Sequence, residues 1–363
     1  MSPATQKALV LPAEKASFEL VTDWPVTLPG PTEVLVKLVS AALNPADAFI
    51  KDNGGGLLIP AYPFILGVDG AGVIEEVGSE VNNVAKGERV MVRAGLDVKR
   101  STFKEYAVFP AAEVLRFPAN ISFDEAATIP LALATAVTGI WAHGEGNHSA
   151  ELTPPWDEGG TTKYAGKAAF ILGGSTSVGQ FVIQCARMQN FSPIIATSSI
   201  KHEDYLKSLG ATHVIDRSLS CDEIKNTLSS LTAGTTIELV YDPWGRDRDS
   251  HRFGYSVLAP GGAFVHVNPF AADWLADLVT ESEKKGENKR VALSWSSYNS
   301  PGNKELGQEI FDRVPGWLET GVIVPNRFEV LPNGLAGVDA GLERMSKGLV
   351  SGIKLTVHPA ETL

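Results

Sequence analysis

Cysteine is scarce in this sequence, and long hydrophobic runs are absent. The 363 residues include two cysteines, Cys185 and Cys221, so a disulfide framework is excluded, although a single bridge is not. The simpler expectation is two buried free thiols. No stretch approaches the roughly 18 uninterrupted apolar residues of a membrane helix, and the N-terminus does not resemble a signal peptide. We therefore expect a soluble, cytoplasmic protein without a membrane partner.

The sequence also lacks basic clusters. Its formal net charge is −11, and it has no run of Lys and Arg. A protein that binds nucleic acid needs a basic face, so we do not expect nucleic acid as a partner. Hydrophobic residues make up 44% and charged residues 20%, which is typical of a globular protein and not of a disordered chain. A chain of this length exceeds one compact core, and we predict two domains.

The first third of the chain is predicted to form a compact, mostly antiparallel β-unit. Short runs rich in Val, Leu and Ala are separated by glycines, as in strands joined by turns. These runs span residues 7–11, 33–42, 72–77 and 89–93. Residues 124–143 are apolar and Ala-rich, which predicts two helical pieces separated near Pro130, with Ser122 as the N-cap.

Strands and helices alternate from residue 168 onward. The predicted strands span residues 168–172, 194–197, 213–216, 237–242 and 263–267, with 291–295 as a sixth. The predicted helices between them span residues 178–188, 204–209 and 223–231. Apolar strands that alternate with helices indicate a parallel sheet covered on both faces. We interpret residues 281–290, which carry mixed charges, as a solvated loop, and we predict a last helix at 309–319 and strands at 328–331 and 354–357.

A glycine-rich turn, Gly173-Gly174-Ser175-Thr176-Ser177-Val178-Gly179, joins the first of these strands to its helix. A dinucleotide site uses glycines for a tight turn and for close approach of the backbone to the pyrophosphate at a helix N-terminus. The usual middle glycine is absent, and the three hydroxyl side chains can donate in its place. A tight turn without a ligand is the alternative, but the strand–helix steps that follow favour nucleotide binding.

The end of the second strand indicates the type of cofactor. A site for NAD usually has an acid here, which binds the ribose 2′-hydroxyl. This chain has Ser198, Ser199, Lys201 and His202 before the first acid, Glu203. Hydroxyls beside a lysine suit a 2′-phosphate, so we favour NADPH, with a solvent-exposed polar turn as an equal alternative on these residues alone.

Several further motifs resemble the medium-chain dehydrogenase/reductase superfamily over nearly the whole chain. They are Asn44-Pro45-Ala46-Asp47, the segments 67–78 and 86–90, Thr135-Ala136, Gly261-Gly262 and Ser351-Gly352-Ile353-Lys354-Leu355. The resemblance implies an α/β fold, in which a Rossmann doubly wound parallel sheet is inserted into a GroES-like β domain. The implied boundaries are 1–130 for the GroES-like domain, 131–318 for the Rossmann domain and 319–363 for the C-terminal return.

The alcohol dehydrogenases of this superfamily carry His-Glu where this chain has Val68-Asp69. Catalytic zinc needs Cys, His and carboxylate ligands, and structural zinc needs four closely spaced cysteines. Both cysteines lie in the alternating half and no Cys-x-x-Cys is present, so we expect no metal site. The chain resembles the zinc-free branch, which contains quinone oxidoreductases, double-bond reductases and the trans-acting enoyl reductases of fungal polyketide synthases. The fungal group is the most similar.

The resemblance also implies the residues of a cofactor site. Ser175–Val178 would hold phosphate; Ser199, Lys201 and His202 would surround the 2′-phosphate, and Arg217 would lie near the adenine. The full set is Asn44, Pro45, Asp47, Thr135, Gly173, Gly174, Ser175, Thr176, Ser177, Val178, Ser199, Lys201, His202, Arg217, Val267, Asn268, Ser351, Gly352 and Lys354.

The chemistry that suits a zinc-free site is hydride addition to a conjugated double bond. Negative charge then develops on the carbonyl oxygen, which hydrogen-bond donors can stabilise, and the α-carbon takes a proton from a side chain or water. The candidate catalytic residues are Thr135, Asn44, Tyr62, Lys51 and Lys354. Thr135 can instead bind only the carboxamide, Tyr62 can simply pack, and the two lysines can be surface residues.

Three functions remain open on the sequence. The first is an NADPH-dependent reductase of free enones or quinones. The second is an enoyl reductase that acts on substrate bound to the carrier protein of a polyketide synthase. The third is a nucleotide-binding regulatory protein without turnover, since fold does not imply function. The chain is expected to be a monomer or a homodimer that pairs through the edge strand at 291–295.

Overall fold

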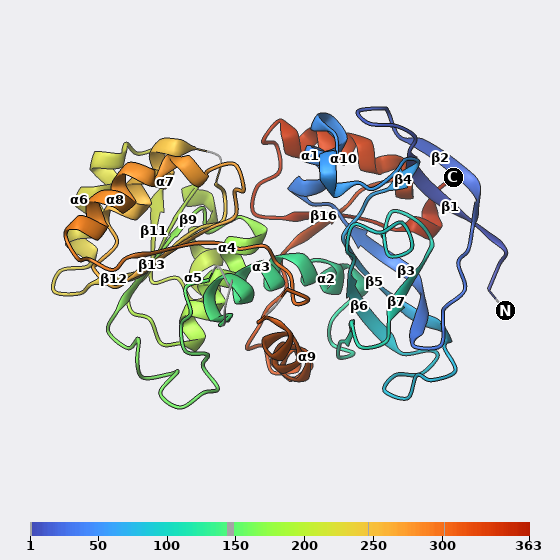
Figure 1. The fold of residues 1–363 in the computed structure, drawn as a ribbon, viewed down its shortest axis with the longest axis horizontal. Coiled ribbons are helices and arrows are strands. Elements are labelled where there is room, and N and C mark those ends of the chain that lie inside the picture. Colours follow the sequence, from blue (N-terminus) through green and yellow to red (C-terminus); the bar gives the residue numbers. More distant parts are fainter. Residues whose placement is uncertain (1, 144–148, 246, 301) are drawn as a thin grey trace. The chain divides into compact units, whose positions relative to one another are not determined.

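The computed structural model describes residues 2–143, 149–245, 247–300 and 302–363, which divide into two compact units. Unit 1 comprises Met1–Leu131, Val314–Gly321 and Pro325–Leu363, and unit 2 comprises Ala132–Arg313 and Val322–Val324. Figure 1 shows both in sequence colours. The division falls inside helix α9 (Lys304–Glu319), so residues 314–318, which the sequence analysis placed in the Rossmann domain, lie with unit 1.

Unit 1 is built on two β-sheets. A seven-stranded sheet has the order β15-β16-β3-β5-β6-β8, with β7 also paired to β3, and a three-stranded sheet has the order β2-β1-β4. The strands are β1 (Thr5–Leu11), β2 (Glu19–Pro25), β3 (Glu33–Ala42), β4 (Phe64–Ile65), β5 (Asp69–Val77), β6 (Arg89–Arg93), β7 (Tyr106–Pro110), β8 (Val114–Arg116), β15 (Phe328–Val330) and β16 (Lys354–Val357). β16 pairs antiparallel with β3, so the predicted C-terminal strands do return to this sheet.

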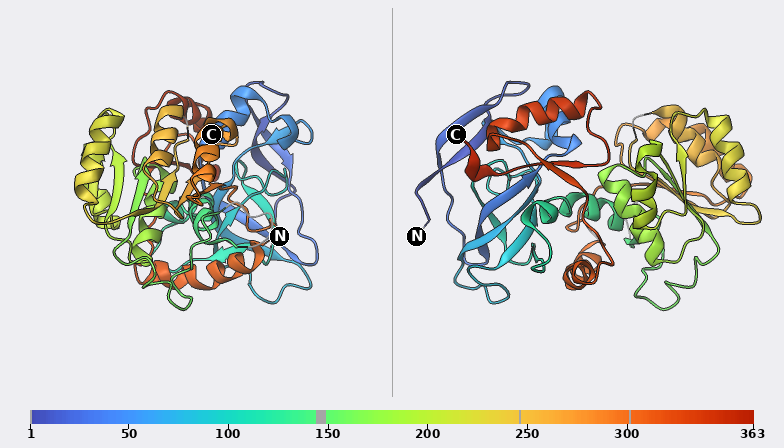
Figure 2. Two further views of the ribbon diagram at one scale, coloured as in Figure 1. Left: turned by 60° about the vertical axis from the view of Figure 1, so that its left-hand side comes forward. Right: turned by 180° about the vertical axis from the view of Figure 1, so that it is seen from behind.

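The helices of unit 1 pack beside these sheets. They are α1 (Pro45–Asn53), α2 (Phe123–Ala127) and α10 (Val338–Ser346), with 3-10 turns η1 (Gly56–Leu58), η4 (Gly334–Gly337) and η5 (Pro359–Glu361). Figure 2 shows α1 and α10 lying beside each other, although they are far apart in sequence. Neither α1 nor α10 was predicted. Ser122 forms the expected capping box with Glu125 at the start of α2.

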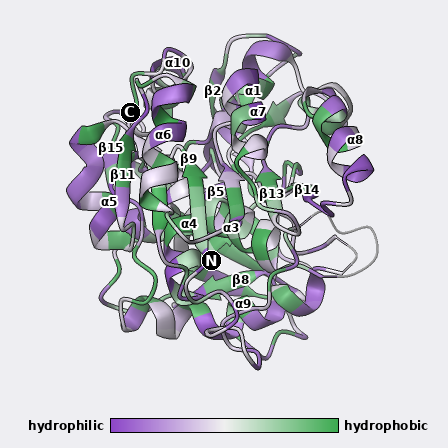
Figure 3. Ribbon diagram, turned by 90° about the vertical axis from the view of Figure 1, so that its left-hand side faces the viewer, coloured by the Kyte–Doolittle hydropathy of each residue, from purple (hydrophilic) through white to green (hydrophobic). Residues whose placement is uncertain are grey.

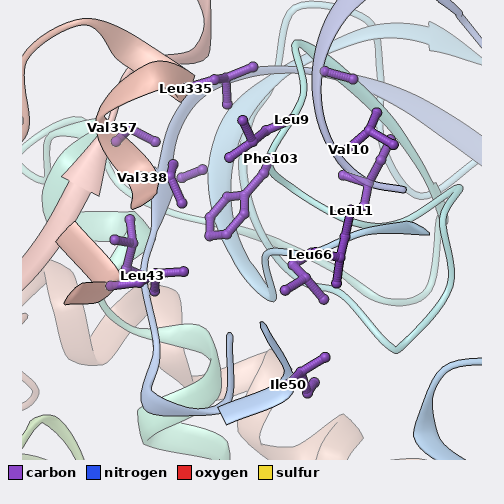
Figure 4. Packing of buried hydrophobic residues seen from close by; sticks show 14 of the residues in the cluster. Leu9, Val10, Leu11, Leu43, Ile50, Leu66, Phe103, Leu335, Val338 and Val357 are labelled. Atoms are coloured by element: carbon purple, nitrogen blue, oxygen red, sulfur yellow. The ribbon is translucent and has the colours of Figure 1, made fainter. Parts of the chain in front are cut away.

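A cluster of buried apolar side chains joins α1 and α10 to the strands. Figure 4 shows Phe103 lying among Leu9, Leu43 and Val338. Complete burial of a phenylalanine side chain contributes about 1.5–3 kcal/mol relative to exposure. The first and last thirds of the chain therefore share one hydrophobic core.

Unit 2 contains a six-stranded sheet in the order β11-β10-β9-β12-β13-β14. Its strands are β9 (Ala168–Leu172), β10 (Ile194–Ser198), β11 (His213–Asp216), β12 (Ile237–Asp242), β13 (Ala263–His266) and β14 (Arg290–Leu293). Every pairing is parallel, which confirms the predicted doubly wound sheet. The sixth strand ends at Leu293, so the exposed Trp295 lies beyond it.

Helices cover both faces of this sheet. They are α3 (Pro130–Trp141), α4 (Ser177–Met188), α5 (Glu203–Leu209), α6 (Cys221–Leu231), α7 (Arg248–Ser256) and α8 (Ala276–Lys284), with 3-10 turns η2 (Ile200–His202) and η3 (Ala272–Trp274). Figure 1 shows α6, α7 and α8 on one side and α4 and α5 on the other. Figure 3 shows hydrophobic residues along β9 and hydrophilic ones over much of α5 and α8.

Unit 2 corrects two expectations and contains one helix that was not predicted. Residues 281–284 belong to α8 and not to a loop. Helix α7 was not predicted. Cys185 is buried, as expected, but Cys221 is exposed, and both are free thiols. None of the described helices combines the length and the hydropathy that crossing a membrane requires.

Candidate functional site

The glycine-rich turn of unit 2 is tight because its neighbours leave no room for side chains. Gly173 has a φ of +92°, which L-residues with a Cβ rarely adopt. A Cβ on Gly174 would lie 2.6 Å from the Cβ of Ala196, and one on Gly179 would lie 2.4 Å from the carbonyl oxygen of Gly173. Backbone conformation or lack of space therefore requires glycine at each of these three positions. Together the three glycines leave the backbone at the start of α4 without side chains.

Thr176 closes the turn as the N-cap of α4. Its hydroxyl oxygen accepts from the Gly179 N–H at 3.0 Å and donates to the Gly173 carbonyl at 2.9 Å. This hydroxyl is therefore committed to the turn itself, unlike the free donor role that the sequence suggested for it. The first N–H groups of a helix have no partner within the helix and point out of its end, so the backbone at this terminus presents donors outward.

The predicted 2′-phosphate residues lie at the end of β10. Ser199 is half-buried, Lys201 is exposed and His202 is buried. The backbone N–H of Arg217 donates to the Ser198 carbonyl at 2.9 Å. The backbone of Arg217, whose side chain is exposed, therefore lies at the same edge of the sheet. Asp216 lies beside Ser198 in the β10–β11 register. Hydrogen bonds from the Ser218 backbone and hydroxyl lower the pKa of Asp216, so the end of β11 carries a negative charge.

Asn268 connects two loops at the ends of β12 and β13. Its amide donates to the Gly245 carbonyl at 2.5 Å and accepts from the Phe270 N–H at 2.8 Å. Val267 and Asn268 are both half-buried. In a parallel sheet the carboxyl ends of the strands share one edge, where ligands of doubly wound folds bind. Unit 2 therefore brings the glycine-rich turn, Ser199, Lys201, Arg217 and Asn268 to one edge.

Thr135 lies in α3 and is 7% exposed. Its carbonyl oxygen accepts from the Tyr241 hydroxyl and from the Ser294 hydroxyl, each at 2.8 Å. A Cβ on Gly139 would lie 2.7 Å from the Tyr241 hydroxyl oxygen, so glycine lets α3 approach β12. Sequence reasoning missed Tyr241 and Ser294, because nothing local marks a strand tyrosine as the anchor of a distant helix.

Unit 1 holds a second group of predicted residues in a buried polar network. Asn44 is the N-cap of α1, and its backbone N–H donates to the Asp47 carboxylate at 2.9 Å. The Asn44 side chain donates to Asp69 Oδ2 at 3.0 Å. Lys354 Nζ reaches the same oxygen at 2.5 Å, and the Leu131 N–H donates to Asp69 Oδ1 at 2.7 Å. Four distant segments thus meet at one carboxylate.

This network corrects the alternative that Lys354 is a surface residue, because it is 4% exposed. Its ammonium also lies 3.4 Å from the Thr128 carbonyl. The second carboxylate, Asp47, accepts from the Gly67 N–H at 3.1 Å. Burial raises the pKa of Asp47 to about 7, and the hydrogen bonds from Asn44 and Gly67 offset part of that effect.

The remaining predicted residues of unit 1 have other surroundings. Lys51 forms an ion pair with Asp339 of α10 at 2.8 Å, and this contact raises the pKa of Lys51. The Tyr62 hydroxyl accepts from the Gly55 N–H at 3.4 Å, and its ring packs against the apolar cluster of unit 1. Gly352 has a φ of +71° in the turn that leads from half-buried Ser351 into β16. Within the described ranges, no three His, Cys, Asp or Glu side chains are grouped as a metal site.

Comparisons with known proteins agree with this architecture. Residues 30–119 match the family model "Alcohol dehydrogenase GroES-like domain", and residues 177–272 match "Zinc-binding dehydrogenase". The chain is 30% identical over 354 residues to trans-enoyl reductase tndF of Aspergillus flavipes, covering 92% of this chain and 93% of that one. It is 29% identical to trans-enoyl reductase grgB of a Penicillium species, covering 98% of each. The crystal structure of the CurK enoyl reductase superposes with a TM-score of 0.78 at 21% identity, over 97% of this chain and 99% of that one.

Proposed function

The chain belongs to the medium-chain dehydrogenase/reductase superfamily, in its enoyl reductase-like branch, and from this premise we propose that it is an NADPH-dependent reductase of activated carbon–carbon double bonds that works without zinc. The observation that carries the proposal is the carboxyl edge of the parallel sheet, where bare backbone at the start of α4 lies near hydroxyl and cationic side chains. The named relatives, two trans-enoyl reductases, support an enoyl substrate over an alcohol.

The residues of unit 2 fit a phosphorylated dinucleotide. The absence of Cβ atoms at Gly173, Gly174 and Gly179 gives a pyrophosphate access to the N-terminus of α4, where the helix dipole favours an anion. Ser199 and Lys201 would bind the 2′-phosphate through a hydroxyl and a positive charge. When bound, the reduced nicotinamide supplies the hydride. Asn268 would orient its carboxamide end.

The zinc-free part of the proposal depends on Asp69. Its carboxylate is bound by Lys354, Asn44 and the Leu131 N–H, which use both of its oxygens. A metal ion at this carboxylate would have to displace a buried ammonium at 2.5 Å. The ammonium of Lys354 is likewise neutralised, so it is not the donor for the substrate carbonyl.

The developing enolate needs a neutral donor that is already in place. We assign this role to the Thr135 hydroxyl, because two hydrogen bonds to the Thr135 carbonyl fix the backbone that carries it. Lys51 is held in an ion pair by Asp339, which argues against it as the proton donor. The Tyr62 hydroxyl accepts from the Gly55 N–H, a contact that does not use the hydroxyl's own proton. The proton for the α-carbon would then come from Tyr62 or from water.

We further propose that the substrate is an enoyl thioester presented by the carrier protein of a polyketide synthase. The relatives tndF and grgB are named trans-enoyl reductases, which favours an enoyl substrate over a quinone. The carrier protein is what the resemblance to the fungal trans-acting group implies. A carrier-bound substrate predicts strong activity on the acyl-loaded carrier and weak activity on small free enones.

The test is NADPH oxidation, followed by absorbance, with three sets of acceptors: free enones and quinones, a short enoyl thioester, and an enoyl-loaded carrier protein. Turnover of the thioester or the loaded carrier with a saturated product supports the proposal. Binding of NADPH without turnover of any acceptor would contradict it and favour a regulatory nucleotide-binding protein. Loss of activity on removal of metal ions by a chelator would contradict the zinc-free chemistry.

A further inference from the structure

Unit 2 contains a buried cluster of ionisable side chains that the proposed mechanism does not use. Asp242 ends β12 and is 2% exposed; His266 ends β13 and is 5% exposed; His251 lies in α7 and is completely buried. Asp242 and His266 are direct neighbours in the parallel register of β12 and β13. The cluster therefore lies directly beneath the carboxyl edge of the sheet, on the side that carries Asn268.

Asp242 is the acceptor at the centre of the cluster. Its Oδ1 accepts from the backbone N–H groups of Trp244 at 3.1 Å and Gly245 at 2.8 Å, and its Oδ2 lies 2.9 Å from His251 Nδ1. A carboxylate can only accept, so the proton of this contact is on Nδ1 and His251 is the donor. His251 thereby fixes the carboxylate that shapes the turn at 244–245.

That turn lies beside the glycine-rich turn. A Cβ on Gly173 would be 3.6 Å from the Cβ of Trp244. The Gly245 carbonyl is in addition the acceptor for the Asn268 side chain. A displaced Asp242 would therefore move both the segment next to Gly173 and the partner that holds Asn268.

His266 links the cluster to the second loop. Its ring lies perpendicular to that of His251, with centroids 4.8 Å apart. Burial, together with a smaller effect of His251, lowers the pKa of His266 to about 4, although Asp242 and a hydrogen bond with the Asn268 backbone act in the opposite direction. His266 is therefore neutral near pH 7 and contacts the backbone of the residue whose side chain bridges the loops.

Packing alone does not explain these polar rings. His251 packs edge-on against Phe264 and Trp274, with centroids 4.7 Å and 5.4 Å away. Among the described residues, His251 Nε2 and His266 Nδ1 are buried without a hydrogen-bond partner. Apolar rings would fill the same volume without burying these nitrogens unpaired, so the contribution of the histidines lies in the hydrogen bonds that they do make.

We propose, on the basis of the function proposed above, that Asp242, His251 and His266 form a positioning network that sets the 244–245 turn and the Asn268 loop for the nicotinamide half of the cofactor. None of the three touches the reacting atoms. Their effect is on the placement of Asn268 relative to the glycine-rich turn, where small displacements reduce hydride transfer steeply.

The test compares His251→Phe, which keeps a ring of similar size but removes the donor, with His251→Asn, whose amide can restore a donor at the position of Nδ1. The measurements are NADPH affinity by fluorescence titration, affinity for 2′,5′-ADP, which lacks the nicotinamide half, and steady-state kinetics with an enoyl thioester. We expect His251→Phe to lower kcat or NADPH affinity about tenfold with unchanged 2′,5′-ADP affinity, and His251→Asn to recover most of the loss.

Three results would overturn the inference. One is a His251→Phe protein with wild-type kinetics, and another is equal impairment of His251→Asn. The third is an equal loss of 2′,5′-ADP affinity, which indicates general damage to unit 2. If the wild-type protein binds no NADPH, the proposed function is overturned as well. If the wild type binds NADPH and turns over the thioester, and His251→Phe has the same affinity and kinetics, only the positioning network is overturned. If His251→Phe does not fold, His266→Phe provides the same comparison from the β13 side.

Discussion

The carboxyl edge in unit 2 and the buried Asp69 network in unit 1 are both candidate parts of one reductase, but they are built in different ways. The glycine-rich turn at the edge in unit 2 is formed by backbone that glycines leave bare, within one short segment after β9. The network in unit 1 is formed mainly by side chains from three segments, those of Asn44 and Asp47, Asp69 and Lys354, joined by the Leu131 N–H. Lys354 lies 285 residues after Asp69. A site made from local backbone tolerates no added side chain, whereas a site made from paired side chains tolerates no missing partner.

The largest effect is expected when the pair in unit 1 is broken. Lys354→Met leaves the Asp69 carboxylate buried without its ammonium, which typically costs about 3–5 kcal/mol of folding free energy. Urea denaturation of the wild type and the variant measures this loss. Asp69→Asn combined with Lys354→Met removes the unpaired charge, so the double variant should be more stable than Lys354→Met alone. Equal stability of the two variants would show that the pair is not the source of the effect.

The backbone site is broken by adding a methyl group. Gly179→Ala would place a Cβ 2.4 Å from the Gly173 carbonyl oxygen, so the turn must open and NADPH affinity should fall about a hundredfold. Gly316→Ala is the matched control, since a Cβ there meets nothing within 4 Å. Fluorescence titration of NADPH measures both. Normal NADPH binding by Gly179→Ala would contradict the assignment of this turn.

The same contrast explains what the sequence could and could not predict. The parallel sheet and the glycine-rich turn were predicted because apolar strands, glycines in turns and residues that cap helices are recognisable within a few neighbouring residues. Asp69 was recognised only as a departure from His-Glu, and Lys354 was named as a candidate donor and cofactor residue but not as the partner of Asp69. Their contact follows from sheet register, in which Thr356 and Asp69 both oppose Ala42. No local pattern encodes that register.

Helix α7 shows a second limit. Its sequence is strongly polar, and its start depends on Asp247, which accepts from the Asp249 and Ser250 N–H groups. Its buried residues are His251, Phe253, Gly254 and Tyr255, and His251 is held by Asp242. Because one of the buried positions is a histidine, the few apolar residues of this nine-residue segment did not by themselves predict a helix. The network of Asp242, His251 and His266 was therefore missed together with the helix.

A smaller effect is expected when Lys201, which would select NADPH over NADH, is replaced. Lys201→Ala removes one exposed positive charge at the end of β10, so the ratio of NADPH to NADH efficiency should fall about tenfold. Lys207→Ala is the control, because Lys207 is also exposed but forms an ion pair with Glu203 one helical turn away. Steady-state kinetics with both cofactors measure the ratio. A Lys201→Ala protein that keeps its preference would remove the argument for a 2′-phosphate site.

The smallest effect concerns the pH dependence of the network in unit 1. The pKa of Asp47 is raised from 3.8 to about 7 in the folded protein, so the folded state binds more protons than the unfolded state between about pH 4 and pH 7. Stability must then fall as pH rises through this window, because the unfolded state carries the charge more readily. Asp47→Asn removes the titration, although it also weakens the hydrogen bond from the Asn44 N–H. Its Tm should therefore be lower than that of the wild type near pH 4 and should approach it toward pH 7. Parallel Tm curves for the two proteins across this range would show that Asp47 is already ionised at pH 4, and that Lys354 and the N–H donors outweigh its burial.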